Sequence, residues 1–166
     1  MAECSNPGFE NHYRVHISYA PIPGMEELKK EWGDDNVEPI FDGRPFTLYA
    51  HCIGMDRSPG ERILYLHDAG YEEWREEDLI IWGLRQRSMI APNGYRPATE
   101  QEVYEFAKAH PELSDFVGLG SSTTFGGRGN RYVACVLTGY DNQRALARSP
   151  RGDRRPRDVR ILFVCK

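Results

Sequence analysis

The sequence lacks the segments that would place it in a membrane, secreted-scaffold or zinc class. No apolar run approaches the ~18 residues that a membrane-spanning helix needs, and residues 1–12 contain neither the basic nor the apolar part of a classical signal peptide. Cysteine is scarce, and its four copies are too widely spaced for a dense disulfide scaffold or a Cys-x-x-Cys zinc knuckle. We therefore expect thiols that are buried or free, no membrane insertion, no metal and no cofactor.

The common catalytic signatures are also missing. HExxH, GxSxG, the phosphate-binding loop and GxGxxG do not occur. Ser121 and Ser122 follow a glycine, but no base that would activate a serine can be identified. His12 and His16 are four positions apart on an expected strand, about 13 Å from each other, which is too far for one metal ion. We expect both histidines to face solvent.

Lysine is missing from the last part of the chain until Lys166. From Arg128 to Lys166, nine arginines and one lysine are set against three aspartates, a balance of +7. The other 127 residues therefore carry −11 of the net charge of −4. Arginine binds phosphate and carboxylate groups, so a nucleic-acid or polyanion surface is one interpretation of this segment. The scarcity of lysine and of aromatic residues there argues against it.

Length and patterning predict one domain with a sizeable core. Strands are expected over residues 12–19, 45–53, 61–67, 132–137 and 159–165. Helices are expected over 25–32, over 71–87 with Trp74, Ile81 and Trp82 facing inward, and after Thr99, which forms a capping box with Glu102. Residues 148–158 are expected to form an arginine-rich loop between two core strands. The expected core contains Val15, Ile17, Val103, Phe106, Val133, Cys135, Ile161 and Phe163.

Two stretches resemble a known fold family. Residues 94–102, Gly-Tyr-Arg-Pro-Ala-Thr-Glu-Gln-Glu, resemble the Gly-aromatic-Arg-Leu-Pro-Thr-x-x-Glu motif of the formylglycine-generating-enzyme-like branch of the C-type lectin fold. Residues 120–125 resemble the Trp-Ser-Ser-Thr-Glu-Tyr stretch of that branch, and strands at 131–137 and 159–165 follow in the same order. The resemblance covers residues 93–166. It implies a single α+β, C-type-lectin-like domain over 1–166, with two main helices and small antiparallel sheets.

The resemblance leads to three groups of proteins with different functions. Formylglycine-generating oxidases use a close cysteine pair, whereas Cys135 and Cys165 are 30 positions apart. Calcium-dependent sugar-binding lectins use Glu-Pro-Asn or Gln-Pro-Asp with Trp-Asn-Asp, and none of these occurs here. The variable proteins of diversity-generating retroelements are the third group. Their C-terminal codons are rewritten at adenines, and a randomised Asn codon never yields Lys, Glu, Gln, Trp or Met.

These five residue types are depleted in one segment of this chain. They occur 27 times in residues 1–125 but only once, as Gln143, in residues 126–160. We therefore expect a non-enzymatic binding protein whose variable region, at about 126–160, contacts a protein or cell-surface ligand. By the same resemblance, we expect it on a virus particle or a cell surface. Polyanion binding through the arginines and a formylglycine-generating oxidase are the alternatives, and the oligomeric state stays open. The expected contact residues are Asn130, Tyr140, Asp141, Asn142, Arg144, Arg148, Arg151, Asp153 and Arg154.

Overall fold

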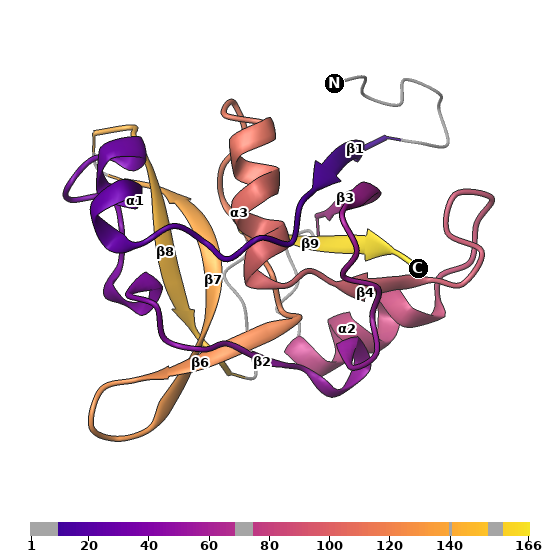
Figure 1. The fold of residues 1–166 in the computed structure, drawn as a ribbon. Helices are drawn as coiled ribbons and strands as arrows, with labels where there is room; N and C mark the ends of the chain where they lie inside the picture. Colours follow the sequence, from indigo (N-terminus) through magenta and orange to yellow (C-terminus); the bar gives the residue numbers. More distant parts are fainter. Residues whose placement is uncertain (1–9, 69–74, 140, 153–157) are drawn as a thin grey trace.

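The computed structural model describes residues 10–68, 75–139, 141–152 and 158–166 (Figure 1). Within them the chain has an α+β architecture in which nine strands join one mostly antiparallel sheet. The expected small sheets are therefore parts of a single one, and a short third helix accompanies the two main ones. The elements are β1 (His12–Ile17), α1 (Met25–Trp32), η1 (Pro39–Phe41), β2 (Thr47–Leu48), η2 (Ala50–Cys52), β3 (Gly60–His67), α2 (Glu76–Arg85), β4 (Tyr95–Pro97), α3 (Glu100–Ala109), β5 (Phe116–Val117), β6 (Ser121–Phe125), β7 (Asn130–Thr138), β8 (Arg144–Pro150) and β9 (Arg160–Cys165).

The last strand lies in the middle of the sheet. The strand order is β1-β3-β9-β5-β7-β6-β2, with β4 added on β9 and β8 added on β7. β9 runs antiparallel to β3 and β4 and parallel to β5. Its continuous apolar run predicts this position, because a central strand is buried on both faces. The C-terminal segment is thus fixed between strands from both halves of the chain.

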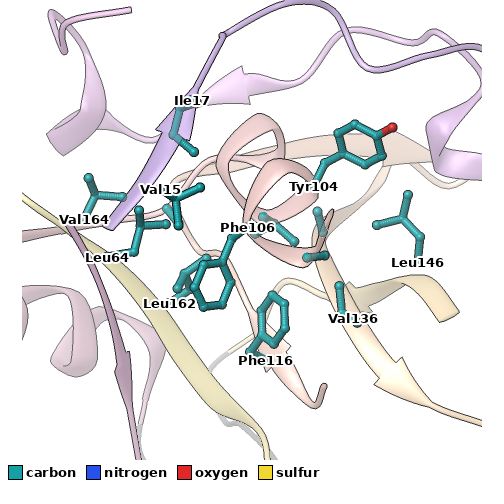
Figure 2. Close-up of a cluster of buried hydrophobic side chains, with 14 of the residues drawn as sticks. Val15, Ile17, Leu64, Tyr104, Phe106, Phe116, Val136, Leu146, Leu162 and Val164 are labelled. Atoms are coloured by element: carbon teal, nitrogen blue, oxygen red, sulfur yellow. The ribbon is translucent and has the colours of Figure 1, made fainter. Parts of the chain in front are cut away.

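Two clusters of apolar side chains form the core. The larger one joins β1, β3 and β9 to α3 and includes Ile17, Leu64, Phe106, Phe116 and Leu162 (Figure 2). The smaller one lies between α2 and the sheet, around Leu79, Val117 and Phe163. All eight residues expected in the core are buried, which confirms that prediction: Val15, Ile17, Val103, Phe106, Val133, Cys135, Ile161 and Phe163.

The two longer helices differ in how well the sequence predicts them. The capping box of α3 is present, with Thr99 and Glu102 exchanging side-chain and backbone hydrogen bonds. The inward face expected for α2 is wrong, because Leu79, Ile80 and Gly83 are buried there while Trp82 is half-buried. Gly83 explains the rotation: a Cβ atom at this position would lie 2.5 Å from the Phe163 ring, so the glycine lets α2 approach the sheet closely. The expected inward residue Trp74 lies outside the described residues, and Ile81 is half-buried.

Three further expectations need correction. Of the strand expected over 45–53, only Thr47–Leu48 pairs with β6, and the chain then turns into η2. Of the loop expected over 148–158, the first three residues belong to β8, and 153–157 lie outside the described residues.

His12 is the third correction, because it is buried rather than exposed. Its ring stacks on Tyr65 with 4.6 Å between centroids, and its Nε2 lies 2.7 Å from the Tyr95 hydroxyl. Because Nδ1 lies 2.9 Å from the backbone oxygen of Glu10, which can only accept, the proton of neutral His12 is on Nδ1. His16 is exposed, as expected.

Candidate binding surface

The structure places the expected contact residues in two separate regions. Tyr140, Asp153 and Arg154 lie outside the described residues. Asn130 begins β7 at the β6–β7 turn, whereas Asp141 and Asn142 are in the β7–β8 turn at the other end of that strand. Because β7 has nine residues, its ends are about 26 Å apart at ~3.3 Å per residue. The expected residues therefore do not form a single patch.

The two turns carry much of the exposed part of the described C-terminal segment. Residues 126–129 of the β6–β7 turn and 130–131 at the start of β7 are all exposed, and Gly126 and Gly129 adopt positive φ angles. Asp141 and Asn142 are exposed as well, with Asn142 at φ 60°, a conformation that asparagine tolerates. The exposed non-glycine side chains of these turns lie outside the core, whereas the two glycines are favoured by their positive φ angles.

Arg144 is used inside the molecule. Its guanidinium donates to the backbone oxygens of Ala107, His110 and Leu113 at 3.0, 3.3 and 2.8 Å, respectively. It also lies 4.9 Å from the centre of the Trp32 ring. Arg144 therefore donates to carbonyl groups at the C-terminal end of α3 and in the segment that follows it, where a cation also complements the helix dipole.

Arg148 is part of a stack of arginine and aromatic side chains. Its guanidinium lies 4.3 Å from the Phe125 ring centre and 4.9 Å from that of Tyr132. The Arg44 guanidinium also lies over Phe125, 4.8 Å from the ring centre. A carboxylate oxygen of Glu38 is 3.8 Å from Nε of Arg148. We call Arg44, Phe125, Arg148 and Tyr132 the arginine–aromatic stack. Nη1 of Arg148 is buried and donates no hydrogen bond to a described residue.

Arg151 anchors the end of β8 to α2 and to the η2 region. Its Nη1 donates to the Leu119 oxygen at 3.0 Å, and its Nε is 3.3 Å from a Glu76 carboxylate oxygen. The guanidinium also lies 4.7 Å from the Tyr49 ring centre. Arg144, Arg148 and Arg151 are all half-buried, so these three expected contact residues hold the C-terminal segment in place.

Two hollows border these regions. One, of about 550 Å³, lies beside the β7–β8 turn and is lined by Glu31, Trp32, Lys108, Gln143 and Arg144. The other, of about 250 Å³, shares Arg44 with the arginine–aromatic stack; we call it the Glu100 hollow. It is lined by Pro21, Ile22, Ile40, Phe41, Gly43, Arg44, Pro45, Phe46, Glu100 and Gln101.

Sequence reasoning missed Phe125, Arg44 and Glu100. Phe125 and Arg44 are 81 positions apart, and only the pairing of β2 with β6 brings their segments together. The one local signal was the capping box, which places Glu100 in the first turn of a helix. It does not show that the helix begins beside an apolar hollow.

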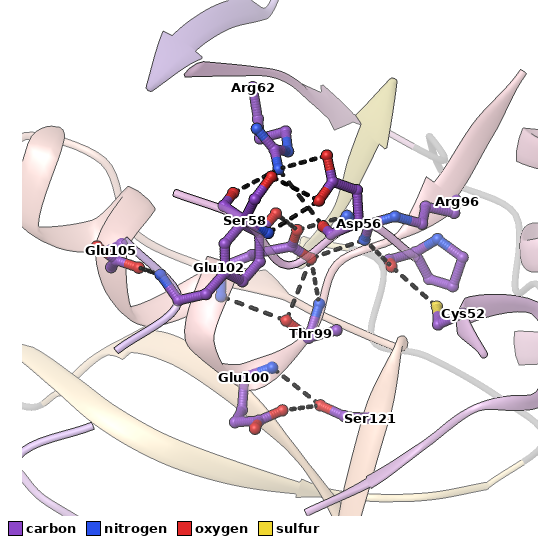
Figure 3. A network of polar contacts seen from close by, with 12 residues as sticks. Cys52, Asp56, Ser58, Arg62, Arg96, Thr99, Glu100, Glu102, Glu105 and Ser121 are labelled. Atoms are coloured by element: carbon purple, nitrogen blue, oxygen red, sulfur yellow. Dashed lines mark hydrogen bonds and ion pairs between the residues drawn. The ribbon is translucent and has the colours of Figure 1, made fainter. Parts of the chain in front are cut away.

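The motif at residues 94–102 forms a buried polar network (Figure 3). Arg96 donates to both carboxylate oxygens of Glu102 at 2.7 and 2.5 Å, and the Thr99 backbone and the Tyr19 hydroxyl donate to the same carboxylate. Burial pushes the pKa of Glu102 upward, but the hydrogen bonds and charge of Arg96 more than offset this and lower it. These motif residues therefore join β4 to α3.

Cys135 and Cys165 do not form a close pair. Cys135 pairs across with Val117, and Val117 pairs with Ile161. Cys165 is four residues farther along β9, about 13 Å at the spacing of a strand. Burial raises the pKa of the Cys135 thiol to about 12, and that of Cys52 to about 11. A reactive cysteine has the opposite tendency.

The described part of the chain contains no group of three or more His, Cys, Asp or Glu residues placed to hold a metal ion. None of its helices has the length and apolar character needed to cross a membrane. Comparisons of the chain with protein-family models, curated proteins and solved structures find no match. Function is therefore inferred from the residues and contacts described above.

Proposed function

We propose that this chain is a non-enzymatic binding protein whose C-terminal surface, presented on a C-type-lectin-like scaffold, contacts a protein or cell-surface ligand. One observation carries the proposal: within residues 126–160 the described apolar and polar side chains are separated in space. The buried residues there are Val133, Ala134, Cys135, Val136, Leu146 and Ala147, all in β7 and β8. The turns at the two ends of β7 are exposed and polar. A rigid strand pair that carries replaceable turns is the arrangement that a variable binding surface requires.

Likeness to the C-type lectin fold rests on the ordered motifs and the positions they occupy. Arg96 and Glu102 join β4 to α3, and Ser121 begins β6, whose first residues lie beside the start of that helix. The strands β7 and β9 follow in the order that the resemblance implies. The depletion of Lys, Glu, Gln, Trp and Met in residues 126–160 supports the further proposal that adenine-directed copying rewrites this segment.

The arginine contacts favour a protein ligand over a polyanion. Arg144 donates to three backbone oxygens, and Arg151 donates to one and pairs with Glu76. Their guanidinium groups bind other parts of the fold. The described segment therefore presents fewer unpaired cations to a ligand than its net charge of +7 suggests. Salt distinguishes the two functions, since polyanion binding falls steeply as the salt concentration rises. A formylglycine-generating activity would need the cysteine pair that the strand register separates.

The genetic test is to sequence the native locus downstream of the codon for Lys166. We expect a near-copy of the segment that encodes residues 126–166, differing almost only where the copy has adenine. Such a repeat would support the variable-protein interpretation and assign the contact residues codon by codon. Its absence would overturn that interpretation. Location on a virus particle or cell surface is proposed from the same resemblance and is tested by immunogold labelling of the native source.

A further inference from the structure

The Glu100 hollow combines apolar walls with one carboxylate. Its apolar lining comes from Pro21–Ile22, from η1 and from Pro45–Phe46, and the rings of Phe41 and Phe46 stack with 6.0 Å between centroids. Glu100 is the only acidic residue in the lining. At about 250 Å³ the hollow is smaller than the roughly 300–1,000 Å³ of sites for drug-sized ligands. It suits one side chain better than a whole cofactor.

Glu100 has few partners within the described part of the chain. The Ser121 hydroxyl donates to one carboxylate oxygen, and the same hydroxyl accepts from the Glu100 backbone N–H at 2.9 Å. Among the residues drawn in Figure 3, Ser121 alone donates a side-chain hydrogen bond to this carboxylate, which also interacts with the Glu100 backbone N–H. No described cation lies within ion-pair distance of the Glu100 carboxylate. Arg57 acts on it only through its electric field, and the nearby Arg96 is paired with Glu102. Partial burial of a charge that has no ion-pair partner is unfavourable, so a cation placed beside this carboxylate would be stabilising.

The other charge at the hollow is already neutralised. Arg44 pairs with Asp42, using both Nε and Nη2 on the two carboxylate oxygens at 2.8 and 2.6 Å. Its Nη1 donates to the Thr124 backbone oxygen. The hollow therefore has one charge without a pairing partner, and that charge is negative.

We propose that the Glu100 hollow binds an arginine or lysine side chain of the ligand, with the aliphatic stem against Phe41 and Phe46 and the cationic group on Glu100. This inference deepens the proposed function and rests on it, because it names the chemistry of one ligand side chain. Long basic side chains bury their stems and keep their charged end on a polar partner, and charge-assisted hydrogen bonds to a carboxylate are among the strong ones. The hollow adjoins the arginine–aromatic stack through Arg44, so it extends the surface that includes Arg148.

The experiment uses small probes on the whole chain. Butylguanidinium, n-butylammonium and, as the anionic counterpart, butyrate are titrated while backbone amide NMR signals are followed. We expect the two cations to shift the signals of residues 43–46 and 100–101 in a saturable way, and butyrate to leave them unchanged. Glu100→Gln keeps an oxygen for the Ser121 hydroxyl but removes the charge, and we expect it to weaken cation binding about tenfold or more. Glu77→Gln, an equal charge change in the first turn of α2, is the matched control and should bind as the unaltered chain does.

Three outcomes would overturn the proposal. They are equal binding by Glu100→Gln and the unaltered chain, saturable binding of butyrate at the same residues, and no saturable binding of either cation. Because the probes are small and the protein is isolated, these results do not depend on whether a template repeat exists at the locus. Failure of the cation site and failure of the variable-surface proposal are therefore distinguishable.

Discussion

At the residue scale, two glutamates in the first turn of α3 have opposite electrostatic situations. Glu102 is fully buried but receives two hydrogen bonds from Arg96, whereas the one side chain that donates to Glu100 among the described residues is Ser121. Burial raises the pKa of Glu100, and hydrogen bonds from the Ser121 hydroxyl and the Glu100 backbone, together with the field of Arg57, only partly offset it. Beside Arg96, the pKa of Glu102 is lowered despite its burial. Substitution by glutamine therefore has opposite consequences at the two positions.

Glu102→Gln is expected to destabilise the fold strongly. It leaves Arg96 charged and buried without its carboxylate, and breaking such a pair costs about 3–5 kcal/mol. Urea denaturation at pH 7 measures the loss, and Glu77→Gln on the exposed face of α2 is the control. Because the folded pKa of Glu102 is lowered, its contribution is present above the unfolded value near 4.5 and is lost as the pH falls through the folded value. The difference between variant and parent should shrink in acid; a small loss at pH 7 would contradict the buried pair.

Glu100→Gln is expected to behave in the opposite way. A raised folded pKa means that the stability contribution is complete below the unfolded value near 4.5 and declines as the pH rises through the folded value. Glutamine does not titrate, so the variant should escape this decline and gain stability relative to the parent between pH 4 and pH 7. Urea denaturation across that range measures the difference. A variant that loses relative stability as the pH rises would show that Glu100 is well paired.

At the scale of the elements, Arg144 connects the start of β8 to the end of α3. Arg144→Met keeps much of the stem over Trp32 but removes the guanidinium donor from three backbone oxygens, of which the His110 oxygen still accepts from the Leu113 N–H. We expect a loss of about 1.5–3 kcal/mol, the range for hydrogen bonds to charged groups, measured by urea denaturation. Arg128→Met in the exposed β6–β7 turn changes the same charge and should lie within about 0.5 kcal/mol of the parent. Equal effects at the two positions would argue against the helix-capping role.

The packing of α2 on the sheet gives a second test at this scale. Gly→Ala inside a helix ordinarily stabilises by up to about 1 kcal/mol. At Gly83, however, the new methyl group would meet Phe163, so we expect Gly83→Ala to destabilise by about 1–3 kcal/mol. Gly24→Ala, where a Cβ atom meets nothing within 4 Å, is the comparison. Thermal unfolding of both variants measures the two changes in stability. A stabilised Gly83→Ala would mean that α2 does not pack closely against Phe163.

Elements with a strong local signal were predictable from the sequence, and contacts made by distant segments were not. Period-two alternation, the capping box and the apolar run of β9 predict β1, α3 and a central last strand. The orientation of α2 depends on its packing against Phe163, and the burial of His12 depends on Tyr65 and Tyr95. Likewise, arginine content correctly marks a basic segment, but only the fold shows that Arg144 and Arg151 donate to backbone oxygens.

At the scale of the whole molecule, the proposal requires that the exposed turns and the strand pair be energetically independent. Replacing Arg128, Asn130 and Asp141 together by serine alters both turns and leaves every buried residue in place. Serine at position 141 can still accept the hydrogen bond from the Gln143 N–H that Asp141 now accepts. We expect each change to stay within about 0.5 kcal/mol.

A single buried substitution in the same segment supplies the contrast. Leu146 is fully buried in β8, and Leu146→Ser should cost at least the roughly 2–5 kcal/mol of a large-to-small core substitution. Thermal unfolding of the triple variant, of Leu146→Ser and of the parent measures this separation directly. Comparable losses in the two variants would mean that the turns are part of the folding unit, and a surface free to vary could not then be built from them. A near-unchanged triple variant beside a destabilised Leu146→Ser would show that stability depends on the buried residues of the strand pair and not on the turn side chains, as variable recognition at its two ends requires.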